Sequence, residues 1–246
     1  MRTSVNTVTI TSPQTNNVVI SRQTFSIIWG LVSGASYSVS VRNLNTNELI
    51  INGRHVMAGT NHTEVLQSQL VAGNQYRIAI AATVGGVTIW SERYFWVQGA
   101  GALHFLHMPP NGTGFTTYGQ AARRWGTHAT LSAIQSAAVA FNGRGFGLVP
   151  VGNISYEDGR AMPPSVSHRQ GRDVDIRPIR TDGSGASVTI HDNSYSHART
   201  RALIQDLLAT GNVTNIFFND EALTNEFAVV SDAPGHDDHL HVRYTA

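Results

Sequence analysis

The chain has 246 residues, of which 41% are hydrophobic and 13% charged, and its formal net charge is +1. This composition indicates a globular protein, and the small net charge argues against nucleic acid as its main partner. Cysteine is absent, so disulfides, thiolate metal sites and cysteine nucleophiles are excluded. Any metal site must therefore use histidine and carboxylate ligands.

Residues 1–98 predict an all-β module. Short runs rich in valine, isoleucine, threonine and aromatic residues alternate with turn residues, as in a two-sheet sandwich. These runs are Val8–Thr11, Val18–Ser21, Phe25–Val32, Tyr37–Leu44, Glu48–Val56, Thr63–Leu70, Tyr76–Val84 and Val87–Val97. The segment Leu70–Tyr76 resembles the tyrosine corner of fibronectin type III domains, and Trp29 on an early strand also resembles that family. We therefore expect an immunoglobulin/fibronectin III-like sandwich, with Trp29 and Trp96 as core residues.

Charge divides the chain into two parts. Residues 1–98 carry six arginines against three acidic residues, and the remainder carries eleven against thirteen. A positive module can help to bind an anionic cell-wall polymer, although an uninvolved spacer is an equally good interpretation. No apolar run is long enough to span a bilayer, and Met1–Pro13 lacks the apolar core of a signal peptide. We expect either a removed signal or another route of export.

A stretch rich in glycine and proline, residues 99–116, predicts a linker between the first module and a second domain, residues 117–246. Helical and strand patterns are mixed in this second domain, which predicts an α+β fold. The expected fold class is therefore multidomain, with an all-β immunoglobulin/fibronectin III-like sandwich followed by an α+β domain.

Two helices and one strand are expected in the second domain. Thr127 can cap a helix that presents one apolar face and ends at Gly143. A second helix is expected from about Ser196 to Thr210. The apolar run Val213–Phe218 then predicts a buried strand.

Four of the eleven histidines fall in two compact clusters. The first cluster is Ser167–Ile176, with the sequence SHRQGRDVDI, and the second is Gly235–Arg243, with the sequence GHDDHLHVR. A catalytic zinc ion uses three nitrogen or oxygen ligands and keeps a fourth position open. Because side chains two apart on a strand face the same side, His168, Asp175 and His241 can converge on one ion.

The spacing H-x6-D followed by H-x2-H-x-H resembles the penicillin-insensitive murein endopeptidases, within the wider group of lysostaphin, D-alanyl-D-alanine metallopeptidases and hedgehog. The resemblance extends over Gly152–Met162 and covers roughly residues 115–246, but none of the first module. It implies that His168, Asp175 and His241 bind Zn²⁺, which would activate water at neutral pH.

The same resemblance implies roles for neighbouring side chains. His239 would act as general base or would stabilise the tetrahedral intermediate electrostatically, and His236 would orient water or substrate. Asp238 is a second candidate for the base, because it lies three residues before His241. We rank it below His239, since on a regular strand it would face the opposite side.

Three further residues have both an ordinary and a functional interpretation. Asp173 is either a solvated carboxylate or one that orients His168 or His239 through a hydrogen bond. Arg160 and Arg243 are either exposed surface residues or bidentate ligands of a substrate carboxylate.

The resemblance implies a peptidoglycan endopeptidase that hydrolyses D-alanyl–diaminopimelyl cross-links. The chain departs from the family because it lacks the family's cysteines and a visible signal peptide, and because it carries an added module. These departures favour a phage lysin, a tail hydrolase or an exported antibacterial effector that acts in the periplasm or cell wall. The first module would then contact the secretion or phage machinery.

Three alternatives stay open. A D,D-carboxypeptidase would remove terminal D-alanine instead of cutting cross-links. A wall-binding protein would keep an inactive metal site that only stabilises the fold. The histidine clusters could also be polar surface features without any shared function.

Overall fold

The computed structural model describes residues 7–245, and the chain divides into two compact units, Met1–Ala100 and Gly101–Ala246. Residues 1–6, which begin the segment Met1–Pro13 considered above as a possible signal peptide, lie outside the described residues. Among the residues that are described, no helix has both the length and the apolar character needed to cross a bilayer.

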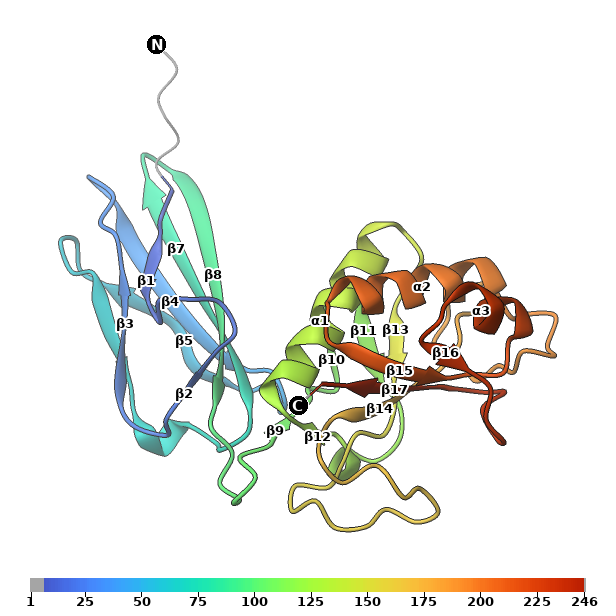
Figure 1. Ribbon diagram of the computed structural model, residues 1–246. Helices are drawn as coiled ribbons and strands as arrows, with labels where there is room; N and C mark the ends of the chain where they lie inside the picture. The colour runs from blue at the N-terminus through green and yellow to red at the C-terminus, as the bar shows by residue number, and fades with distance from the viewer. Residues whose placement is uncertain (1–6, 246) are drawn as a thin grey trace. The chain divides into compact units, whose positions relative to one another are not determined.

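The N-terminal unit contains two β-sheets (Figure 1). One has three antiparallel strands in the order β1-β3-β6, and the other has five in the order β2-β8-β7-β4-β5, with β2 parallel to β8. The bounds are β1 Ile10–Ser12, β2 Val18–Ile20, β3 Phe25–Trp29, β4 Ser36–Asn43, β5 Leu49–Val56, β6 His62–Val65, β7 Gln75–Val84 and β8 Val87–Val97. Each of the eight predicted strand segments overlaps one of these strands.

One hydrophobic core joins the inner faces of these two sheets. Tyr76, Ile78 and Ile80 alternate along β7 and are fully buried in it, because a strand directs every second side chain to the same face. Trp29 belongs to this core, as predicted. Trp96 is also buried, but its side chain lies on the opposite face of β8 from the residues that belong to this core.

The C-terminal unit is built on a seven-stranded sheet in the order β10-β11-β13-β14-β17-β15-β16, accompanied by the pair β9 and β12. The bounds are β9 Leu106–His107, β10 Asn111–Gly112, β11 Phe115–Thr117, β12 Trp125–Gly126, β13 Val149–Val151, β14 Asp173–Ile176, β15 Val213–Phe217, β16 Val230–Ser231 and β17 Leu240–Tyr244. Strand β17 lies between β14 and β15 and is antiparallel to both.

Helices α1 (His128–Gly143) and α2 (His197–Ala209) pack against each other over one face of this sheet, and α3 (Glu221–Glu226) follows β15 (Figure 1). The side chain of Thr127 accepts a hydrogen bond from the backbone of Thr130 and so caps α1, as predicted. Ser196 caps α2 in the same way. Both predicted helices are therefore confirmed. A strand is also present at β15, but it is not buried as predicted, because Thr214 is exposed and only Ile216 within the strand is buried.

The predicted fold class is wrong as stated. Strand residues make up 36% of the chain and helical residues only 17%, and the strands are distributed over several sheets. The fold is therefore mostly β, and not clearly a sandwich followed by an α+β domain. The physical reason is that many strands of the C-terminal unit are only two or three residues long. Such strands are too short to give an alternating pattern in the sequence.

The pairing of β14 with β17 determines which side chains share a face. Asp173 lies opposite Arg243, and Asp175 lies opposite His241. The residues that alternate with them are fully buried on the other face: Val174, Ile176, Leu240 and Val242. Asp173, Asp175 and His241 therefore share one face of the sheet, and Asp175 contacts His168 of the long segment between β13 and β14. This segment lies on the side of the sheet away from α1 and α2 (Figure 1).

Candidate metal centre

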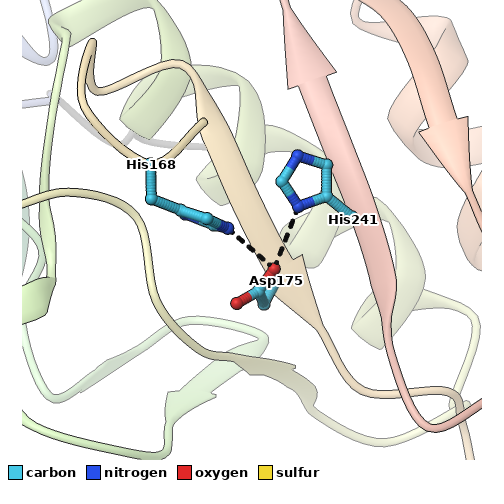
Figure 2. A group of neighbouring side chains, drawn as sticks. All are labelled: His168, Asp175 and His241. Atoms are coloured by element: carbon cyan, nitrogen blue, oxygen red, sulfur yellow. Dashed lines mark hydrogen bonds and ion pairs between the residues drawn. The ribbon is translucent and has the colours of Figure 1, made fainter. Parts of the chain in front are cut away.

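Three side chains from three separate segments form a group that can hold a metal ion. His168 comes from the segment between β13 and β14, Asp175 from β14 and His241 from β17 (Figure 2). Their ligand atoms all lie within 4.8 Å of one another. His168 Nε2 lies 3.0 Å and His241 Nδ1 lies 3.3 Å from the same oxygen, Asp175 Oδ1. The three residues that the sequence singles out as ligands are thus adjacent in space.

The segment before β14 places His168 by backbone contacts. Gly171 adopts a φ of 65°, and a Cβ atom there would lie 2.9 Å from the Cα of Gly126. Glycine therefore permits both the left-handed turn and the close approach of the two chains. The buried His168 ring has its Nδ1 2.8 Å from the carbonyl oxygen of Ile154. Since a carbonyl only accepts hydrogen bonds, Nδ1 carries the proton and Nε2 is left to face Asp175.

His241 is held by a second carboxylate. Its Nε2 lies 3.1 Å from Asp173 Oδ1 and 3.3 Å from Ser167 Oγ. Asp173 Oδ1 also accepts a 2.6 Å hydrogen bond from Arg243 Nε. Asp173 therefore orients His241, and not His168 or His239, which the sequence suggested as its partners.

Hydrogen bonds between neighbouring side chains shift the pKa values of His241 and Asp175. Burial disfavours a charged His241, but its hydrogen bonds to Asp173 and Asp175 outweigh burial and raise its pKa to about 9. For Asp175, burial disfavours the carboxylate, but hydrogen bonds from His168 and His241 hold its pKa below the ordinary value. A bound cation would replace the proton of His241 in balancing the two carboxylates.

Two more histidines lie beside these three. His239 Nε2 is 3.8 Å from Asp175 Oδ1, and its Nδ1 donates a 2.7 Å hydrogen bond to Asp238 Oδ1. The His236 ring lies 4.7 Å from the His239 ring, measured between centroids. Burial and the neighbouring His239 lower the pKa of His236, so that it favours the neutral form near pH 7.

A cleft of about 360 Å³ opens over the group. Its lining includes the three candidate ligands, His236 and His239, and an apolar wall from the segment before His168. The lining residues are Arg123, Asn153, Met162, Pro163, Pro164, Ser165, His168, Asp175, Pro234, His236, His239 and His241. The group is thus covered by protein on one side and accessible on the other, as binding of a substrate requires.

Other candidates from the sequence lie differently. Asp238 is exposed and contacts the group only through His239. Arg160 forms an ion pair with Asp158 and stacks on Tyr156, with its guanidinium carbon 3.7 Å from the ring centroid. Arg243 contacts Asp173.

The cleft residues that were not identified from the sequence include Arg123 and Asn153. Arg123 lies on a short 3-10 turn, Ala121–Arg123, and donates through Nε to the hydroxyl of Tyr156. Asn153 donates a 3.3 Å hydrogen bond to Asp175 Oδ2. Asn153 lies within the stretch Gly152–Met162 that contributes to the family resemblance, so a closer reading of that stretch could have identified it. Arg123 follows no spacing pattern that could have revealed it.

Comparison of the sequence with models of known protein families gives no match, and comparison with curated proteins gives none either. Inferences about chemistry therefore depend on the residues of the site.

Proposed function

We propose that this protein is a zinc-dependent peptidoglycan endopeptidase that hydrolyses D-alanyl–diaminopimelyl cross-links. The observation that carries the proposal is the convergence of His168, Asp175 and His241 at the base of a cleft that two further histidines also line. A purely structural site would have little use for additional histidines at its open side.

Two imidazoles and one carboxylate form a ligand set that suits zinc, because Zn²⁺ binds nitrogen and oxygen ligands and tolerates a three-residue site with an open position. His168 would bind through Nε2 and His241 through Nδ1, since their other nitrogens face Ile154 and Asp173. A bound zinc ion would supply Lewis-acid activation of water and of the scissile carbonyl.

We assign His239 as the general base. Its Nδ1 proton is donated to Asp238, which leaves Nε2 as a proton acceptor on the side of Asp175. Asp238 thus positions His239, and this arrangement explains why an exposed carboxylate lies beside the cleft. His236 lies against His239 and favours the neutral form, with Nδ1 facing the carbonyl oxygens of Ala233 and Pro234, so its Nε2 can accept a hydrogen bond from the substrate.

The choice of peptidoglycan depends on the resemblance of the two histidine motifs to the murein endopeptidases. Action in the periplasm or cell wall, after export or phage delivery, follows from the same resemblance. A role of the N-terminal unit in contacting the wall or a delivery machinery belongs to the proposal as well.

The test is mass spectrometry of soluble products from diaminopimelate-type sacculi incubated with zinc-loaded protein. His168→Ala removes a ligand, and His55→Ala, an exposed histidine on β5, is the matched control. We expect the unchanged protein and the control to convert cross-linked dimers to monomers, and His168→Ala to leave dimers intact.

Each other outcome has a definite meaning. Loss of terminal D-alanine with intact dimers would identify a carboxypeptidase instead. Intact sacculi with stoichiometric zinc would identify a wall protein whose metal site is inactive, and would contradict the proposal.

A further inference from the structure

A second cavity, of about 650 Å³, lies in the C-terminal unit beside the metal centre. Its lining includes three arginines, Arg169, Arg172 and Arg243, together with Asp173. The other residues that line it are uncharged: Leu103, Gly159, Val166, Ser167, Gln170 and Tyr244. With three guanidinium groups and one carboxylate, its wall carries a net charge of +2.

The cavity wall is positively charged, although the part of the chain that contains it is slightly acidic. Residues 99–246 contain eleven arginines and thirteen acidic residues, so an evenly mixed surface would be slightly negative. Asp173 supplies the one carboxylate in the wall of the cavity, and its Oδ1 already contacts His241 and Arg243. An anion that enters the cavity would therefore meet guanidinium groups with donors to spare.

The three arginines keep such donors. Arg243 contacts Asp173 through Nε, and Arg169 donates through Nε to the carbonyl of Gly159. Arg172 donates through one terminal nitrogen to the amide oxygen of Gln170. Each contact uses one edge of a guanidinium group, which has five donor hydrogens and binds carboxylates in a bidentate manner.

The register of the sheet places the cavity relative to the metal centre. Asp175 and His241 form one cross-strand pair of β14 and β17, and Asp173 and Arg243 form the next pair on the same face. Two residues along a strand correspond to about 7 Å. Two residues of an extended peptide cover a similar distance.

We infer that the cavity lined by Arg169, Arg172 and Arg243 binds a carboxylate of the wall peptide, about two residues from the bond held at the metal centre. The inference rests on the proposed function, since it assigns a subsite to the same substrate. The size of the cavity suits a side chain or peptide terminus, and the free carboxylates of wall peptides supply the charge.

The experiment measures binding of zinc-loaded, full-length protein to sacculi, in a His239→Ala background that prevents turnover. Three preparations serve as probes: native sacculi, sacculi amidated with carbodiimide and ammonia, and sacculi freed of phosphodiester polymers with hydrofluoric acid. Arg169→Gln/Arg172→Gln is the test variant. Arg201→Gln is the control, because Arg201 pairs with Glu226 away from the cavity.

We expect amidation to weaken binding about tenfold, as expected for the loss of a charge-assisted contact. The double variant should bind native sacculi equally weakly and should lose nothing more on amidated sacculi. Hydrofluoric acid and Arg201→Gln should change nothing. The single variants, each expected to lose about threefold, give the same comparison if the double variant fails to fold.

Tight binding of the double variant to native sacculi would overturn the inference. A loss that persists on amidated sacculi but vanishes after hydrofluoric acid would also overturn it, in favour of a phosphate ligand. Cleavage by the protein with His239 intact is measured in parallel. Absence of cleavage with the expected binding pattern would contradict the proposed function alone.

Discussion

Asp173 has two effects on His241: its hydrogen bond orients the ring, and its negative charge raises the pKa of the ring. Replacement of Asp173 by asparagine separates these two effects. Asparagine keeps the size of a side chain that is 6% exposed, but it removes the negative charge beside His241 Nε2 and Arg243 Nε. A hydrogen bond to a charged group contributes about 1.5–3 kcal/mol, and loss of a partner that orients a metal-ligating histidine weakens metal binding roughly 10- to 100-fold.

Proton release gives the sharper result. Without metal, His241 has a pKa of about 9, so at pH 7.5 it is protonated and must lose its proton when a metal binds. Metal affinity should therefore rise with pH, by about tenfold per unit, until the pH reaches about 9. Asp173→Asn lowers the pKa of His241 toward its ordinary value, so fewer protons are released at pH 7.5 and the pH dependence becomes shallower.

Isothermal titration of zinc in two buffers with different ionisation enthalpies measures both affinity and proton release. Asp182→Asn is the control, because Asp182 is an exposed carboxylate that pairs with Arg180. Proton release by Asp173→Asn equal to that of the unchanged protein would refute the role assigned to Asp173. An unchanged affinity at pH 9 would refute the orienting effect.

Three other substitutions test separate parts of the structure. His239→Ala should keep one zinc ion by elemental analysis but lower the rate of cross-link cleavage about 10²- to 10⁴-fold, and loss of the zinc would identify His239 as a ligand instead. Gly171→Ala should lower the melting temperature and reduce the free energy of unfolding by about 1–3 kcal/mol, because Gly171 has a φ of 65° and a Cβ there would lie 2.9 Å from backbone atoms. Gly145→Ala has a similar φ but open space around its Cβ, so an equal loss there would show that strain alone explains the effect. Thr127→Ala should cost about 1 kcal/mol in chemical denaturation, and no loss would mean that the cap of α1 is dispensable.

The sequence is informative where the physical cause is local. Capping by Thr127, the apolar face of α1 and the alternation along β7 all depend on neighbours within a few residues, and these elements were predicted. The grouping of Asp175 with His241 was predicted from the two histidine motifs and their resemblance to the murein endopeptidases, because strand parity fixes only which side chains of one strand share a face.

Non-local features were not predictable. The two-residue strands β9, β10, β12 and β16 exist because partner strands supply their hydrogen bonds, and this made the predicted fold class wrong. The contact of Asp173 with His241 depends on the register between β14 and β17, so the sequence suggested other histidines as its partners. Arg123 lines the cleft from the turn Ala121–Arg123, which precedes α1, and no spacing in the sequence links this turn to the histidine motifs.

Strand β17 also affects how this part of the chain folds. It supplies His241 and at the same time joins β14 to β15, so the sheet and the metal centre are completed by one event. Asp175 and His241 are 66 residues apart in the chain, and contacts of such sequence separation form slowly because a long loop must close first. A metal ion bound to both would fasten this loop in the folded state and slow its opening. Chelation would then shorten the lifetime of the central sheet as well as remove the bound ion.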